Sequence, residues 1–224
     1  MSQTSLIFLV ILVAIAAFVV IQVQAAKRRQ TLAAWALSHG LEFHSAHDDS
    51  LGDRHPHFAC LNRGDHRYAD NVMEGQIEGH RVCAFDYHYE TSNGDDKTRH
   101  HLSAVIVTTN LPLKPLVIRH RNFLDQVAAA VGFEGIQFEW TEFNKEFHVT
   151  SSDHRWAFDV LPQATMEFLM NSPKFTLEFQ LCQVMAYRNA LFQPADFDSA
   201  IQVVEGILRR LPPSLVKELR GVEE

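Results

Sequence analysis

Cysteine is scarce in this chain of 224 residues, which holds only three cysteines, far apart and without a CxxC pair. So few cysteines, in an odd number, fit a reducing compartment better than a framework of disulfides. Basic residues are also in the minority, with 20 Lys and Arg against 27 Asp and Glu, and the formal net charge is −7. Because the sequence has no basic stripe that could neutralise phosphates, we expect no nucleic acid partner.

The common signatures of catalysis are missing as well. The sequence contains no GxxxxGK[ST], GxGxxG, HExxH or GxSxG motif. These motifs are typical of phosphate-binding loops, of the metal-binding helix of zinc proteases and of the nucleophile elbow. We therefore predict no catalytic residue and no cofactor from motifs.

What the chain does have is a long apolar run near its start. Residues 6–21 include no polar side chain, and the uncharged stretch continues to Ala26. As a helix, residues 6–26 would be about 31 Å long, which matches a bilayer core of about 30 Å. The sequence predicts a single-pass transmembrane anchor over residues 1–26, in contact with membrane lipid through residues 6–26.

Three basic residues, Lys27, Arg28 and Arg29, follow this run directly, and no Lys or Arg precedes it. Basic flanks of a membrane helix stay in the cytoplasm. The charge pattern therefore predicts a cell-membrane protein with its amino terminus outside and its soluble domain in the cytoplasm.

An export signal is the alternative interpretation of the same run. Small residues near Ala25 could form a cleavage site, which would release a secreted domain. Against this, the start MSQTS has no basic residue, and the apolar part is longer than the roughly 7–15 residues of a signal peptide. We favour the uncleaved anchor.

The remaining chain predicts an α+β fold. A juxtamembrane helix over residues 27–40 should end at Gly40, and the soluble domain should cover 41–224. Residues 80–109 alternate and enclose a turn at 92–96, as in a β-hairpin, and Pro112 and Pro115 should break the chain. Further strands are expected at 40–45, 57–62, 67–75, 116–119, 136–140, 146–152 and 174–188, with helices at 123–131, 154–161, 163–171 and 195–211.

This order of elements predicts a mostly antiparallel sheet with helices packed on one face. A hairpin and helix in the first half are echoed by strands and helices in the second. The domain could therefore consist of two related halves, 41–135 and 136–224.

Histidine is the compositional oddity, because eleven of the 13 histidines lie between His39 and His120. An extended His55-Pro56-His57 would place both rings on one side. On the hairpin, Asp86, His88 and Glu90 share a face that could meet histidines of the opposite arm. The candidate metal ligands are His55, His57, His88, His100 and His101.

A simpler interpretation of the histidines is equally concrete. Loop histidines would be exposed polar residues, and Asp86, His88 and Glu90 would form the solvated side of a half-buried hairpin. Under this interpretation no metal binds.

The stretch NVMEGQIEGHRVCAFDYHYE, followed by the hairpin and LPLKPLVIR, resembles a family of uncharacterised bacterial single-pass membrane-anchored proteins. These have an amino-terminal anchor, a glycine-rich turn and an FDY-x-Y strand. The resemblance implies the same architecture and brings no activity with it.

We therefore expect a membrane-anchored cytoplasmic binding or scaffolding module without catalytic activity, with an unknown protein partner. The alternatives are a metal-dependent enzyme that uses the histidine-rich region 44–101, and a secreted domain released near Ala25.

Overall fold

The first helix is one unbroken rod. The computed structural model describes residues 3–94, 96–121 and 135–221, and α1 occupies Gln3–Ser38, which include no Gly or Pro. The helix ends in a Schellman motif, in which the Gly40 amide donates to the Leu37 carbonyl and the Leu41 amide to the Ala36 carbonyl. Gly40 has φ +68°, so the predicted stop at this glycine is confirmed.

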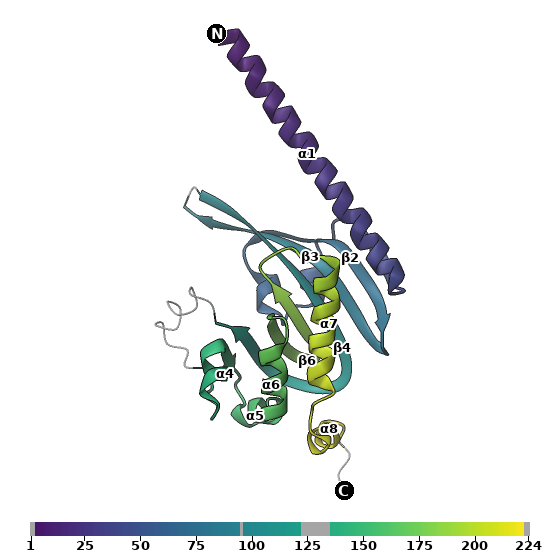
Figure 1. Ribbon diagram of the computed structural model, residues 1–224, viewed down its shortest axis with the longest axis vertical. Coiled ribbons are helices and arrows are strands. Elements are labelled where there is room, and N and C mark those ends of the chain that lie inside the picture. The colour runs from purple at the N-terminus through teal and green to yellow at the C-terminus, as the bar shows by residue number, and fades with distance from the viewer. Residues whose placement is uncertain (1–2, 95, 122–134, 222–224) are drawn as a thin grey trace.

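The two ends of α1 have different surroundings. Its apolar amino-terminal part projects away from the rest of the molecule (Figure 1), and side chains such as Phe8 and Ile21 are exposed. Near its other end, Leu32, Trp35 and Ala36 are buried against the domain. Within the described residues, α1 is the one helix long and apolar enough to span a membrane.

In the described part of the chain, six strands form one antiparallel sheet. They are β1 (Glu42–His44), β2 (Asp65–Ile77), β3 (His80–Asn93), β4 (Asp96–His120), β5 (Phe147–Thr150) and β6 (Thr176–Arg188). The order is β1-β2-β3-β4-β5, and β6 pairs with the other edge of β4. The long β4 can accept both β3 and β5 on one edge because β3 pairs with its first half and β5 with its last four residues.

Tight turns set the register of β2, β3 and β4. Glu78 and Gly79 have φ +51° and +86°, the left-handed pair that a type I′ turn requires, and Ile77 pairs with His80 across it. The predicted β3–β4 hairpin is confirmed, and its register closes at Asn93 opposite Asp96. His88 lies directly opposite His101 in this register.

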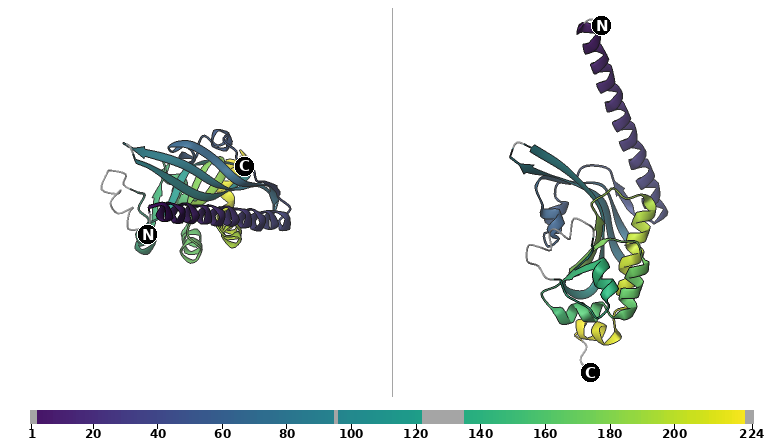
Figure 2. Two further views of the ribbon diagram at one scale, coloured as in Figure 1. Left: turned by 90° about the horizontal axis from the view of Figure 1, so that it is seen from above. Right: turned by 60° about the vertical axis from the view of Figure 1, so that its left-hand side comes forward.

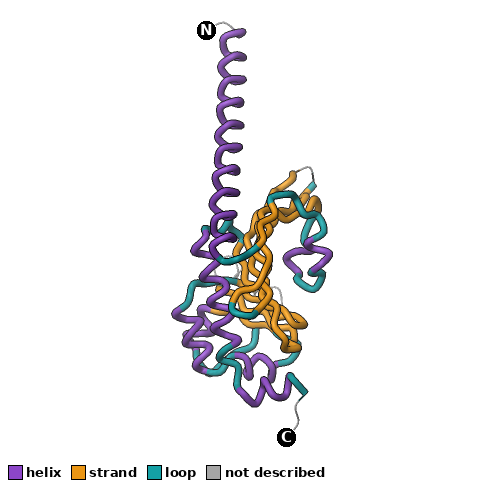
Figure 3. Tube along the Cα trace, turned by 90° about the vertical axis from the view of Figure 1, so that its right-hand side faces the viewer, coloured by secondary structure: helices purple, strands orange, loops and turns teal. Residues whose placement is uncertain are grey.

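The main helices cover one face of the sheet. These are α4 (Thr141–Glu146), α5 (His154–Val160), α6 (Gln163–Asn171) and α7 (Pro194–Leu208), while α8 (Pro213–Leu219) follows at the far end. Figures 2 and 3 show α1 on the same side of the sheet as these helices. Short α2 (Leu51–Arg54) and η1 (Ala59–Asn62) lie on the opposite side. The predicted α+β class is confirmed.

Each face of the sheet has its own apolar core. The larger one lies under the helices and includes the end of α1, and the smaller one lies between the sheet and the segment with α2 and η1. Strands from both predicted halves belong to the one sheet. The division into two related halves at residue 135 stays a prediction.

Three predicted elements are wrong. The segment 57–62 is not a strand, because its last four residues form the 3-10 helix η1, and residues 136–140 are irregular. The chain does not break at Pro112 and Pro115, because β4 continues through both. Both prolines lie where the β4–β6 register shifts, so no ladder hydrogen bond needs their missing N–H. The predicted helix at 123–131 lies outside the described residues.

Candidate functional site

A buried ion pair joins the end of the apolar run to the middle of the sheet. The Arg28 guanidinium donates to both carboxylate oxygens of Asp86 on β3, at 2.8 and 2.7 Å, and to the Phe192 carbonyl at 2.8 Å. Asp86 also accepts from the Asn71 amide at 2.9 Å and from the Ser103 hydroxyl at 2.5 Å. We call Arg28, Asp86, Asn71 and Ser103 the latch.

The latch buries two charged groups, since the Asp86 side chain is only 2% exposed and the Arg28 side chain 19% exposed. A carboxylate without water needs charge and hydrogen bonds from the protein, and a bidentate guanidinium supplies both. The expected solvated face of the hairpin is therefore wrong for Asp86. Its charge is covered by a residue 58 positions earlier in the chain.

A line of polar side chains runs beside the latch. Asp70 contacts His47 Nδ1 at 2.6 Å and His88 Nε2 at 3.3 Å, and His88 Nδ1 lies 2.5 Å from His101 Nδ1. Two ring nitrogens this close must share one proton. Tyr68 stacks on His88, with centroids 4.8 Å apart.

The pKa values on this line follow from these contacts. Burial alone would raise the pKa of Asp70, but the hydrogen bond from His88 and the charge of His47 outweigh it, and the pKa is lowered. Burial and the neighbouring charge of His88 lower the pKa of His101. Asp70 therefore keeps its charge to a lower pH than a free carboxyl group does, and the His101 ring takes up a proton less readily than a free imidazole.

A groove of about 540 Å³ opens where α1 leaves the domain. One wall is the last part of the apolar run and the basic residues that follow it, and the other is the sheet with the latch and the Asp70 line. We call it the junction groove, and it is lined by Ile21, Gln22, Gln24, Ala25, Arg28, Arg29, Ser45, His47, Asp70, Asn71, Asp86, His88 and Leu191.

The predicted metal ligands are spread over three places. His55 and His57 both contact the Gln183 side-chain oxygen, at 3.1 and 3.0 Å. His100 contacts the Thr91 hydroxyl at 2.7 Å and stacks on Tyr89.

His88 and His101 form the third place, and their pairing across the hairpin agrees with the expected contact between its arms. Among the described residues, no three or more His, Cys, Asp or Glu side chains are grouped so that they could hold a metal ion. Metal binding by these five histidines stays a prediction.

The basic triplet is also divided. Arg28 points into the latch, whereas Lys27 and Arg29 are exposed on α1. Their role in membrane topology stays a prediction.

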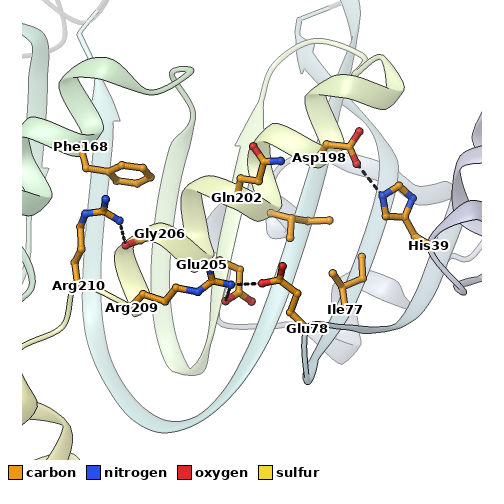
Figure 4. Close-up of a pocket in the computed structure, with 11 residues that line it drawn as sticks. His39, Ile77, Glu78, Phe168, Asp198, Gln202, Glu205, Gly206, Arg209 and Arg210 are labelled. Atoms are coloured by element: carbon orange, nitrogen blue, oxygen red, sulfur yellow. Dashed lines mark hydrogen bonds and ion pairs between the residues drawn. The ribbon is translucent and has the colours of Figure 1, made fainter.

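A second groove of about 400 Å³ lies on the helical face, between α7 and the β2–β3 turn (Figure 4). Two ion pairs bridge its rim, His39 with Asp198 at 3.1 Å and Glu78 with Arg209. We call it the helical-face groove, and it is lined by His39, Ile77, Glu78, Phe168, Asp198, Ile201, Gln202, Glu205, Gly206, Arg209 and Arg210. The rim ties the end of α1 and the turn to α7.

The sequence did not indicate that Asn71 and Ser103 belong to the latch. It also did not indicate that Asp70 lies at the centre of the Asp70 line, between His47 and His88. Asn71 has φ +51°, a left-handed residue at a β-bulge of β2, and no pattern in the sequence marks that bulge. The available signal was Asp86 itself, which lies between the buried strand residues Phe85 and Tyr87.

Together these observations define an α+β domain carried on a helix that is long and apolar enough to cross a membrane. No family model and no curated protein matches the chain. The chain is similar to the crystal structure of the mycobacterial trehalose monomycolate transport factor A, TtfA. The TM-score is 0.57 at 16% identity, over 83% of this chain and 96% of that one. At this identity the likeness shows the fold alone.

Proposed function

We propose that this chain is a membrane-anchored, non-catalytic binding module whose domain lies on the cytoplasmic side and serves a membrane transport system. The exposed apolar side chains of α1 support the anchor, and Lys27, Arg28 and Arg29 support this orientation. The description of TtfA as a transport factor supports a membrane transport system as the partner.

The latch is the observation that carries the proposal. A tether that merely keeps an enzyme near a membrane can be flexible. Here α1 enters the domain without a break, and Arg28 is bonded to the central strand β3 through Asp86. The domain is therefore held in a fixed orientation relative to its anchor, which suits a module that presents a surface to a membrane-embedded partner.

The continuity of α1 also favours an uncleaved anchor over a secreted domain. A cleavage after Ala25 would cut inside the helix, three residues before Arg28. If the chain were secreted, the mature protein would begin at Ala26, and amino-terminal sequencing would find that start.

Two measurements test the proposal. A reporter enzyme that is active only outside the cell, fused to the carboxyl end, should stay silent. A photo-crosslinking residue at Gln202, in the exposed wall of the helical-face groove, should give one reproducible adduct with an integral membrane protein. The matched control is the same residue at Arg155 on α5, whose side chain is 82% exposed.

Each measurement can contradict a separate part. An active reporter would place the domain outside and refute the orientation. Equal adducts from positions 202 and 155, or none from either in native membranes, would refute a specific partner at that groove.

A further inference from the structure

The junction groove lies where a membrane lipid would present its headgroup, if α1 spans the bilayer as proposed. Its apolar side chains, Ile21, Ala25 and Leu191, are joined by polar ones from the sheet. Ile21 and Ala25 belong to the end of the apolar run, which should lie at the boundary between acyl chains and headgroups. A ligand in this groove would therefore be an amphiphile with its apolar end toward the bilayer.

The charges of the groove cancel. Among its lining residues, Arg28 and Arg29 contribute two positive charges and Asp70 and Asp86 two negative charges, which gives zero with neutral histidines. A phosphate-binding cleft would instead carry an excess of positive charge. The groove has no such excess to attract an anionic headgroup.

Neither carboxylate is open to a cationic headgroup. Asp86 is sealed in the latch, and Asp70 is bonded on both oxygens by His47 and His88. A zwitterionic headgroup would leave its ammonium without a carboxylate partner here.

The groups that remain are mostly uncharged donors and acceptors. In the hydrogen bonds formed among the described residues, the side chains of Gln22, Gln24, Arg29 and Ser45 take no part, and all four are exposed. Amides and a hydroxyl can each donate and accept, and the guanidinium adds a fork of donors. This set is complementary to a ligand with many hydroxyl groups.

We propose that the junction groove binds the uncharged, hydroxyl-rich headgroup of a glycolipid. The volume of about 540 Å³ falls in the range of small-molecule sites. The inference rests on the proposed membrane anchor, and it names the class of ligand that the transport module recognises.

The test uses the full chain in phosphatidylcholine nanodiscs that also hold a diglucosyl diacylglycerol, phosphatidylglycerol or phosphatidylethanolamine. A photo-crosslinking residue replaces Ser45 in the groove, and intact-protein mass spectrometry counts lipid adducts. The same residue at Ser214, exposed on α8 at the opposite end, is the positional control.

The glycolipid should give the most adduct at position 45 and none above background at 214. Replacing both groove amides, Gln22→Leu with Gln24→Leu, should lower the glycolipid adduct about thirtyfold, since the two lost hydrogen bonds are worth about 1 kcal/mol each. Gln30→Leu on the same helix, outside the groove, should leave the adduct unchanged.

Failure of the anchor and failure of the groove give different results. If the anchor is absent, the chain will not stay with nanodiscs in high salt. If the chain stays but the three lipids give equal adducts, or phosphatidylglycerol or phosphatidylethanolamine gives the most, the glycolipid assignment is overturned. It is also overturned if the double glutamine variant binds as well as the parent chain.

Discussion

Removal of the Arg28 guanidinium tests the latch most directly. In Arg28→Met the helix keeps a long side chain with a high helix propensity, but Asp86 loses three of its supports at once: the positive charge and two hydrogen bonds. The carboxylate cannot turn toward water, because it is 2% exposed and lies in a central strand. Among the residues that the structure describes, Asn71 and Ser103 are the side chains that still donate to it.

The expected cost follows from this burial. Removing one partner of a buried ion pair costs about 3–5 kcal/mol, because the other charge is left without compensation. For a domain of this size, each kcal/mol lowers the melting temperature by about 2–4 °C. Arg28→Met should therefore melt about 6–20 °C lower than the parent chain.

The assay is thermal unfolding of the full chain in detergent, followed by tryptophan fluorescence, since Trp35 and Trp156 are buried in the domain. Arg29→Met is the matched control, because it removes the same charge from the same triplet but from an exposed position. It should change the stability by less than about 0.5 kcal/mol.

A second substitution separates the buried charge from other effects of the first. In Arg28→Met with Asp86→Asn the carboxylate is gone, and the new amide can bond to Ser103 and Asn71. The double variant should recover at least half of the lost stability. The reasoning about the latch is refuted if Arg28→Met has the same melting temperature as Arg29→Met. It is also refuted if adding Asp86→Asn lowers the melting temperature of Arg28→Met further.

Three further substitutions have clear expected outcomes in the same unfolding assay. Leu32→Ala should cost about 2–5 kcal/mol because Leu32 is 1% exposed, while Leu37→Ala, 80% exposed on the same helix, should be nearly neutral; equal effects would contradict packing of α1 on the domain. Burial raises the pKa of Glu178, so the native state holds the proton of this carboxyl more tightly, and the free energy of unfolding falls as pH rises from about 4.5 through the folded pKa. Glu178→Gln should be more stable than the parent chain at pH 7 and should lose this dependence of stability on pH. An unchanged pH dependence would count against the raised pKa. Gly64→Ala should cost about 2 kcal/mol or more beyond Gly94→Ala, because its Cβ would meet a backbone carbonyl at 2.1 Å whereas Gly94 has open space at a similar φ; equal losses would disprove the close approach.

Local signals predicted much of the fold. Alternating residues gave β3 and the long strand β6, and helical periodicity gave α7. The helix expected at 154–161 is observed as α5, and the Asp153 carboxylate caps it by accepting from the Trp156 amide at 3.0 Å. Such signals work because turns, caps and periodicity depend on neighbours in sequence.

The wrong predictions share a different cause. Residues 136–140 read as a strand, but the Asn144 side chain bonds both backbone groups of Phe138, at 2.9 and 2.6 Å, in place of a neighbouring strand. Pro112 and Pro115 read as a break, but bulges between β4 and β6 leave room for them. In each case the structure of the segment depends on residues that lie outside it in the sequence.

The candidate site divides in the same way. The sequence by itself determined that the chain has a helix long and apolar enough to cross a membrane, because length and apolarity are properties of a continuous stretch. The tertiary structure alone decided that Arg28 meets Asp86, and that the apolar part of α1, the β2 bulge and the hairpin enclose one groove. A buried charge requires a partner, but where that partner lies in the chain is fixed only when α1 packs on the sheet.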